Sequence, residues 1–274
     1  MAEASKISWT DSTVNFWYGC KKKTPGCAYC YMFRWARRSG RNPETVTRSA
    51  DSTFYASLKW MKGRRIFTCS LSDFFIAEAD AFRLEAWGVI KDTPQHEWLI
   101  LTKEIERAPA HIPWLVNESS IRPWPHVVLG VSGENQRMLD RRLCALLDIP
   151  VARYFLSLEP LLGPIDLRRH CRRKGFERIA EVMVGGESGG PKYRSLVDKV
   201  IYLDGTNERG WRPKDAALEW VRSLRDQCAE LGIRFLFKQW GGTTPESGVK
   251  ILDGRIWDQW AERKDDLSVT QSLF

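Results

Sequence analysis

The sequence has no apolar run of the length that a membrane-spanning helix requires, and its first residues include no apolar segment typical of a secretion signal. It also has no internal repeat, no low-complexity segment and no long linker. We therefore expect a cytoplasmic protein without a membrane partner. Its 274 residues suit one large domain, predicted to cover residues 1–274.

Several common catalytic motifs are also missing. There is no Walker loop and no nucleophilic serine elbow, and the glycine-rich stretch 185–190 does not match the dinucleotide-binding pattern G-x-G-x-x-G. The four histidines have no metal-ligand spacing such as H-x3-H. Seven cysteines, an odd number, argue against a disulfide framework in a chain expected in the cytoplasm.

The composition is that of an ordinary globular protein, with 43% hydrophobic and 28% charged residues. The 42 basic and 34 acidic residues give a net charge of +8. This charge permits a polyanionic partner without requiring one.

Short apolar segments alternate with helical patterns along the chain, which is typical of parallel βαβ units. The predicted helices are Tyr29–Arg38, Tyr55–Met61, Ala81–Ile90, Asn135–Leu147 and Asp215–Leu231. The predicted strands are Thr13–Tyr18, Arg65–Cys69, Trp98–Leu101, Val127–Val131, Arg153–Leu156, Glu181–Val184 and Arg234–Phe237. About seven such units in a chain of this length predict an α/β fold with a complete or partial (β/α) barrel.

Three cysteines, Cys20, Cys27 and Cys30, follow the first predicted strand with C-x6-C-x2-C spacing. A C-x2-C pair can place two thiolates on one metal or cluster. The lysines at 21–23 would favour the thiolate forms. A structural zinc site has four ligands, whereas a cluster held by three cysteines leaves one iron open for chemistry. Three unrelated buried cysteines are the alternative.

Polar residues follow nearly every predicted strand, and in a (β/α) barrel these strand ends converge on the face that carries active sites. Taken singly, they have simpler explanations: Asp73 could be a helix N-cap, Glu159 a solvated strand end and residues 185–190 a tight turn. Lys238 is well placed to meet an anionic ligand. The candidates are Cys69, Ser72, Asp73, Ser132, Glu134, Glu159, Gly185, Gly186, Glu187, Ser188 and Lys238.

Together with the cysteine loop, the motifs Leu-Thr-Lys, Gly-Val-Ser, Ser-Leu-Glu-Pro-Leu-Leu-Gly, Gly-Gly-Glu-Ser-Gly and Phe-Lys-Gln-Trp-Gly resemble, over nearly the whole chain, the phage-associated three-cysteine-motif proteins. These are relatives of the radical S-adenosylmethionine (SAM) enzymes. The commonest spacing in those enzymes is C-x3-C-x2-C, and here the first gap is six.

The resemblance implies a [4Fe-4S] cluster bound by Cys20, Cys27 and Cys30 in the loop after the first strand, with SAM on the open iron. Reductive cleavage of SAM would yield a 5′-deoxyadenosyl radical. The implied cofactor-binding residues are Ser72, Asp73, Ser132, Glu134, Glu159, Gly185, Gly186, Glu187 and Ser188. Of these, Glu159 or Glu187 would bind the SAM ammonium, and the glycine-rich amides or a lysine the SAM carboxylate.

The sequence therefore predicts a radical SAM-type enzyme, with Cys69 and Lys238 as catalytic candidates. We expect a nucleic acid or nucleotide substrate, held partly by Lys21–Lys23, Arg34, Arg37, Arg38 and Arg41, and a reductase or flavodoxin-type electron donor. Cys69 has three possible roles: fourth cluster ligand, hydrogen-atom donor or simple packing. The alternatives are a nucleic-acid-binding protein stabilised by a metal or cluster without SAM chemistry, and a phage-encoded interaction protein on a degenerate barrel.

Overall fold

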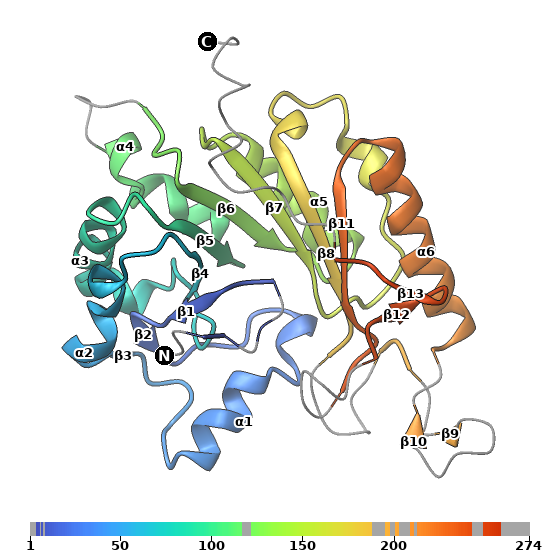
Figure 1. Ribbon diagram of the computed structural model, residues 1–274, viewed down its shortest axis with the longest axis horizontal. Helices are drawn as coiled ribbons and strands as arrows, with labels where there is room; N and C mark the ends of the chain where they lie inside the picture. The colour runs from blue at the N-terminus through green and yellow to red at the C-terminus, as the bar shows by residue number, and fades with distance from the viewer. Residues whose placement is uncertain are drawn as a thin grey trace.

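The computed structural model describes residues 4–5, 7, 9–116, 122–187, 195–197, 201–202, 209–210, 213–242 and 249–258. Its centre is one curled sheet of seven parallel strands that forms a half-barrel (Figure 1). The strands in sheet order are β1 (Ser12–Val14), β4 (Arg65–Thr68), β5 (Glu97–Thr102), β6 (Val127–Ser132), β7 (Arg153–Leu158), β8 (Ile179–Gly185) and β11 (Arg234–Gln239). The fold is therefore α/β, and of the two predicted forms it has the partial barrel.

The first predicted strand is divided in two. Only β1 joins the large sheet, and β2 (Trp17–Tyr18) pairs antiparallel with β3 (Thr47–Arg48). The Asn15 side chain accepts a hydrogen bond from the Leu71 amide at 2.9 Å, and the Phe16 carbonyl accepts one from the Ser49 amide at 2.9 Å. These contacts turn the chain away from the sheet and toward the cysteine loop.

Helices cover the outer face of the curled sheet, with α3, α5 and α6 lying along it in Figure 1. Asn135 caps α5 by accepting from the Met138 amide at 3.0 Å, as its N-cap position requires. In place of the helix predicted at Tyr55–Met61, the structure has the short helix α2 (Asp51–Phe54) followed by a 3₁₀ helix at Ala56–Lys59. Met61, the last residue of the predicted helix, is 90% exposed. The helices are α1 (Tyr31–Arg38), α2 (Asp51–Phe54), α3 (Asp80–Lys91), α4 (Pro113–Val116), α5 (Gln136–Leu147) and α6 (Asp215–Glu230). Within the described ranges, no helix has both the length and the apolar character needed to cross a bilayer.

The edge strand β11 is covered by a hairpin of β12 (Ile251–Leu252) and β13 (Arg255–Ile256). The Phe237 amide donates to the Trp257 carbonyl at 2.8 Å, and Leu236 bridges Asp258. A covered edge cannot pair with a second molecule, which removes a common route to aggregation. A further short pair, β9 (Ile201–Tyr202) and β10 (Arg209–Gly210), is also antiparallel.

Side chains alternate between the two faces of the sheet, as the two-residue period of strands requires. The inner face forms its own apolar cluster, capped by Trp9 from the N-terminal segment; its members are Trp9, Phe67, Leu99, Val128, Phe155, Met183 and Leu236. Gly130 allows the Phe155 ring to cross β6, because a Cβ there would lie only 2.5 Å from that ring. The alternating residues form the much larger cluster beneath the helices.

Two strand positions before this apolar layer, the inner face carries buried charges that pair with one another. Arg65 Nε lies 2.6 Å from Glu97 Oε2, Arg153 pairs with the same carboxylate, and Glu181 lies 4.0 Å from Arg65. Such buried charges are tolerated when they are paired. Two positions beyond the apolar layer, the same alternation points strand-end residues such as Ser157 and Lys238 inward. The sheet therefore determines which residues line the site.

Candidate active site

A cavity of about 410 Å³ lies where the parallel strands end. Its wall contains residues from the ends of β4, β5, β6, β7 and β11 and from the segment after β8. This placement at the carboxyl ends of parallel strands is where (β/α) proteins build active sites. The predicted candidates that line it are Cys20, Cys27, Cys30, Cys69, Ser72, Asp73, Ser132, Glu159, Glu187 and Lys238. The convergence expected from the sequence is confirmed for these ten residues.

The three cysteines of the loop reach this cavity from one short segment. Pro25–Cys27 form a 3₁₀ turn in which Cys27 is buried, and the Cys30 amide donates to the Cys27 carbonyl at 3.4 Å. Cys30 is the N-cap residue of α1, so its side chain lies beside the free amides of the first helical turn. The loop thus presents three half-buried or buried thiols to one space.

Burial raises the pKa of Cys20 and of Cys30 above the ordinary range of a thiol, so the expectation that the lysines at 21–23 would favour the thiolates is wrong. Asp73 and the other two loop cysteines raise the Cys20 pKa further, because their negative charges would oppose a thiolate at Cys20. At Cys30, the Met32 and Phe33 amides and Lys103 oppose the effect of burial. A bound cation would relieve this repulsion, because cysteine ligates metals as the thiolate.

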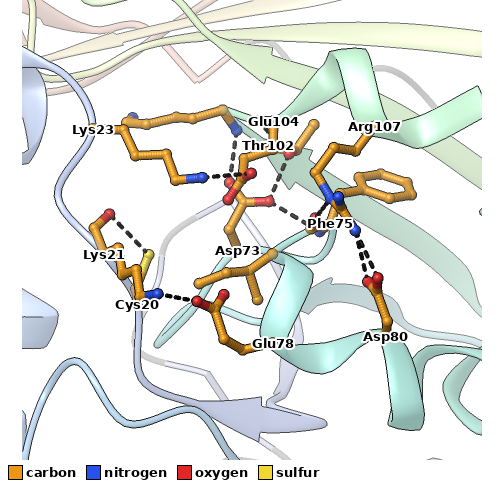
Figure 2. Close-up of polar contacts among 12 residues, drawn as sticks. Cys20, Lys21, Lys23, Asp73, Phe75, Glu78, Asp80, Thr102, Glu104 and Arg107 are labelled. Atoms are coloured by element: carbon orange, nitrogen blue, oxygen red, sulfur yellow. Dashed lines mark hydrogen bonds and ion pairs between the residues drawn. The ribbon is translucent and has the colours of Figure 1, made fainter.

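The loop is fastened to the rim of the cavity by its lysines (Figure 2). Lys21 pairs with Glu78, Lys23 pairs with Glu104, and Lys22 donates to the Ala28 carbonyl at 2.7 Å. The Lys21 and Lys23 ion pairs bridge from the loop to the segments after β4 and β5, whereas the Lys22 hydrogen bond lies within the loop. The sequence suggested that the three lysines contact nucleic acid, but each has an intramolecular partner in the structure.

The three loop thiols are the donor set available to an iron–sulfur cluster. In the described part of the chain, no three His, Cys, Asp or Glu side chains converge closely enough to ligate one metal ion. A [4Fe-4S] cluster is bound through a different iron by each cysteine, so its ligands surround a volume rather than a point. Three thiols lining one cavity, from a loop held at both sides, match that requirement.

Asp73 braces the rim (Figure 2). Its carboxylate accepts from the Thr102 hydroxyl at 2.6 Å, the Lys103 amide at 2.7 Å and the Phe75 amide at 3.0 Å. The sequence raised a helix N-cap as its simpler role; the structure shows the carboxylate joining the segments after β4 and β5. Ser72 similarly donates to the Gly19 carbonyl. Both residues line the cavity while holding its wall together.

Glu134, another predicted cofactor-binding residue, does not line the cavity. Its side chain is completely buried and pairs with Arg142 of α5 at 2.7 Å. Although burial raises the Glu134 pKa, Lys103 and Arg142 hold it below the ordinary range, so the group stays a carboxylate. A Cβ at Gly26 would lie 3.1 Å from Glu134, so the cysteine loop packs directly on this side chain. Glu134 thus contacts the cysteine loop without lining the cavity, which is a supporting role.

On the opposite side of the cavity, Lys238 pairs with Glu159, and both side chains are less than one fifth exposed. The Lys238 ammonium also lies 5.5 Å from the centre of the Trp9 ring. Glu187 accepts from the Ser195 amide at 2.7 Å. Lysine and carboxylates here offer both signs of charge to a zwitterionic ligand.

The glycine-rich segment is only partly described. Gly185 and Gly186 do not line the cavity. A Cβ at Gly186 would meet the Trp240 carbonyl at 2.2 Å, so glycine is needed there for close packing against β11 and the segment after it. Ser188 lies outside the described residues.

Cys69 directly follows β4 in a left-handed conformation, with φ of 53°, and is only 3% exposed. Burial raises its thiol pKa, whereas the Phe16 and Trp17 amides lower it by hydrogen bonding to the sulfur. These amides belong to the turn between β1 and β2. The sulfur is therefore used as an acceptor within the wall of the cavity.

Further residues complete the wall, and among them sequence reasoning missed Trp9 and Lys250. Trp9 and Lys250 line the cavity from the two ends of the chain, where no motif marks them. Tyr31 crosses from α1 to donate to the Ser70 carbonyl. Tyr31 is 42% exposed and lines the same cavity as Cys30 and Glu159. The i, i+3 spacing of Tyr31 and Arg34 could have indicated that both face the site.

Fold and site together define an α/β half-barrel protein with a three-cysteine loop over a cavity at the strand ends. The chain belongs to the family described as "Protein of unknown function (DUF5131)", whose model matches residues 4–261. No curated protein matches the sequence.

Proposed function

We propose that this protein is an iron–sulfur enzyme of the radical SAM type. The observation that carries the proposal is the presence of Cys20, Cys27 and Cys30 in the wall of the same cavity as the strand-end polar residues. A protein that used its metal only for folding would have no need to combine these features. The cluster and SAM, when bound, supply the reducing electron and the radical that starts the reaction.

The protein's own residues would bind and orient the cluster and SAM. Cys20, Cys27 and Cys30 would hold the cluster. Glu159, which pairs with Lys238, offers a carboxylate to the SAM ammonium, and Lys238 offers an ammonium to the SAM carboxylate. Glu187 lies on the same wall. A ligand with both charges would replace the internal ion pair with two new ones, so little desolvation energy would be lost.

The lining also limits the access of water. Trp9, Phe67 and Leu101 form an apolar floor beneath the polar groups. Exclusion of water protects reactive intermediates from side reactions. The mouth of the cavity carries Tyr29 and Tyr31, which are 48% and 42% exposed. A nucleic acid or nucleotide is the proposed substrate, and a reductase or flavodoxin-type protein is the proposed electron donor.

The test is metal and sulfide analysis of anaerobically reconstituted protein. We expect about four irons and four sulfides per chain, the composition of a [4Fe-4S] centre. The C27A/C30A variant should lose both, whereas C144A/C171A, which removes two cysteines outside the cavity, should retain them. Stoichiometric zinc without sulfide would instead favour the alternative of a metal-stabilised nucleic-acid-binding protein.

A further inference from the structure

Helix α1 has two faces of opposite character. Met32, Phe33 and Ala36 are buried against the protein. Tyr31, Arg34 and Arg38 follow one another at i, i+3 and i+7, which places them on the opposite face. The helix contains no acidic residue. Its outward face is therefore a stripe of positive charge.

This stripe begins inside the candidate site. Tyr31 and Arg34 line the cavity, and Arg38 is exposed at the far end of the helix. The eight residues of α1 span about 12 Å at 1.5 Å per residue. The stripe thus leads from the cavity wall to open surface.

The arginines at the outer end are available to a ligand. Arg37 and Arg38 are exposed, and neither pairs with a carboxylate among the described residues. Other surface arginines, such as Arg168 and Arg222, do have acidic partners. An exposed cation without an internal partner can bind a phosphate without first breaking an ion pair.

Aromatic rings accompany the charge. Trp35 stacks on Tyr18 with ring centres 5.6 Å apart, and the Arg41 guanidinium lies 5.3 Å from the Tyr18 ring. Exposed Tyr29 stands at the cavity mouth. Basic side chains combined with aromatic platforms are how proteins bind single-stranded nucleic acids.

We propose, on the basis of the enzymatic function above, that the substrate is a single-stranded polynucleotide whose backbone follows α1 through Arg34, Arg37 and Arg38 and delivers one base to the cavity. A paired base cannot enter, because chemistry on a base requires it to leave the duplex stack. The loop lysines, which have partners within the protein, take no part. The polymer, rather than a free nucleotide, is favoured because the stripe extends beyond the cavity.

The test is fluorescence anisotropy with labelled DNA and RNA single strands of about 16 nucleotides, and with the matching duplexes, over a range of salt concentrations. Each lost phosphate contact should reduce the slope of log K against log salt by about 0.7, so R37Q/R38Q should reduce it by about 1.4. At 0.1 M salt this corresponds to about 25-fold weaker binding, if the electrostatic contribution vanishes near 1 M. The DNA and RNA arms identify the type of strand.

R172Q/K174Q is the matched control, since it removes two exposed cations near the opposite end of β8 from the cavity. It should leave both affinity and slope unchanged. The proposal would be overturned if R37Q/R38Q bound the single strands as tightly as the parent protein does. It would also be overturned if the control lost as much affinity as R37Q/R38Q, or if duplexes bound as tightly as single strands. Iron and sulfide content measured on the same samples separates this outcome from failure of the enzymatic function.

Discussion

Removal of Arg142 tests whether Glu134 is a supporting residue, as the structure shows, or a cofactor ligand, as the sequence suggested. The R142M variant would remove the paired cation of the completely buried Glu134 carboxylate and would leave Lys103 as the positive charge that still acts on it. Loss of one partner of a buried pair costs about 3–5 kcal/mol. We therefore expect the free energy of unfolding, measured by denaturant titration, to fall by that amount.

The double variant R142M/E134Q provides the decisive comparison. It removes both charges, so the remaining loss is chiefly that of the Arg142 hydrogen bond to the Ser132 carbonyl, 2.8 Å long in the structure. One such bond contributes about 1–2 kcal/mol. The double variant should thus be more stable than R142M by about 2 kcal/mol and should still bind SAM. A double variant less stable than R142M, or one that retains iron but has lost SAM binding, would refute the supporting role.

The same pair predicts a dependence of stability on pH. Because Lys103 and Arg142 hold the Glu134 pKa below its unfolded value of about 4.3, the carboxylate stabilises the fold above that pH. This contribution is lost as the pH falls through the lower, folded pKa. E134Q should therefore lose less stability than the parent protein when the pH falls from about 5 to about 3.

Three further outcomes follow from the site and its surroundings. C69S should keep the iron content and cluster spectrum of the parent, since the Cys69 sulfur accepts from backbone amides; loss of iron would restore the ligand role. K23M leaves Glu104, 8% exposed, without its cation, at a cost of about 1–3 kcal/mol. It should therefore lose iron to a chelator faster than K21M, whose ion pair is solvent-exposed; equal rates would contradict the fastening role. Burial lowers the His96 pKa, so the unfolded state takes up a proton first below about pH 6.5 and stability falls on acidification; H96Q should lose less stability between about pH 7 and 5, and an unchanged loss would disprove the assignment.

The sequence predicted the sheet well, because each strand is a short apolar run with its own turn signals. It also predicted the meeting of Cys20, Glu159 and Lys238 at one end of the sheet, since parallel strands share their direction. The division of the first strand was missed, because Asn15 is turned by contacts with residues more than fifty positions away. Local patterns carry no information about such partners.

The roles of individual polar residues were harder to predict for the same reason. Glu134 and Glu159 both follow strands, but only the fold shows that Arg142 of α5 neutralises the first and that the second faces the cavity. The loop lysines were predicted as nucleic-acid contacts from their charge alone, whereas Glu78 and Glu104 lie beside them in space. Trp9 carries no motif at all and lines the cavity through the packing of the N-terminal segment.

The central claim is a three-cysteine cluster whose open iron binds SAM in the cavity. Electron paramagnetic resonance of the anaerobically reconstituted, reduced protein, recorded before and after addition of SAM, tests it most directly. We predict the signal of a reduced [4Fe-4S] cluster that changes when SAM is added, with the change abolished in C27A/C30A. A cluster signal that SAM leaves unaltered, or a protein that binds no iron, would contradict the claim.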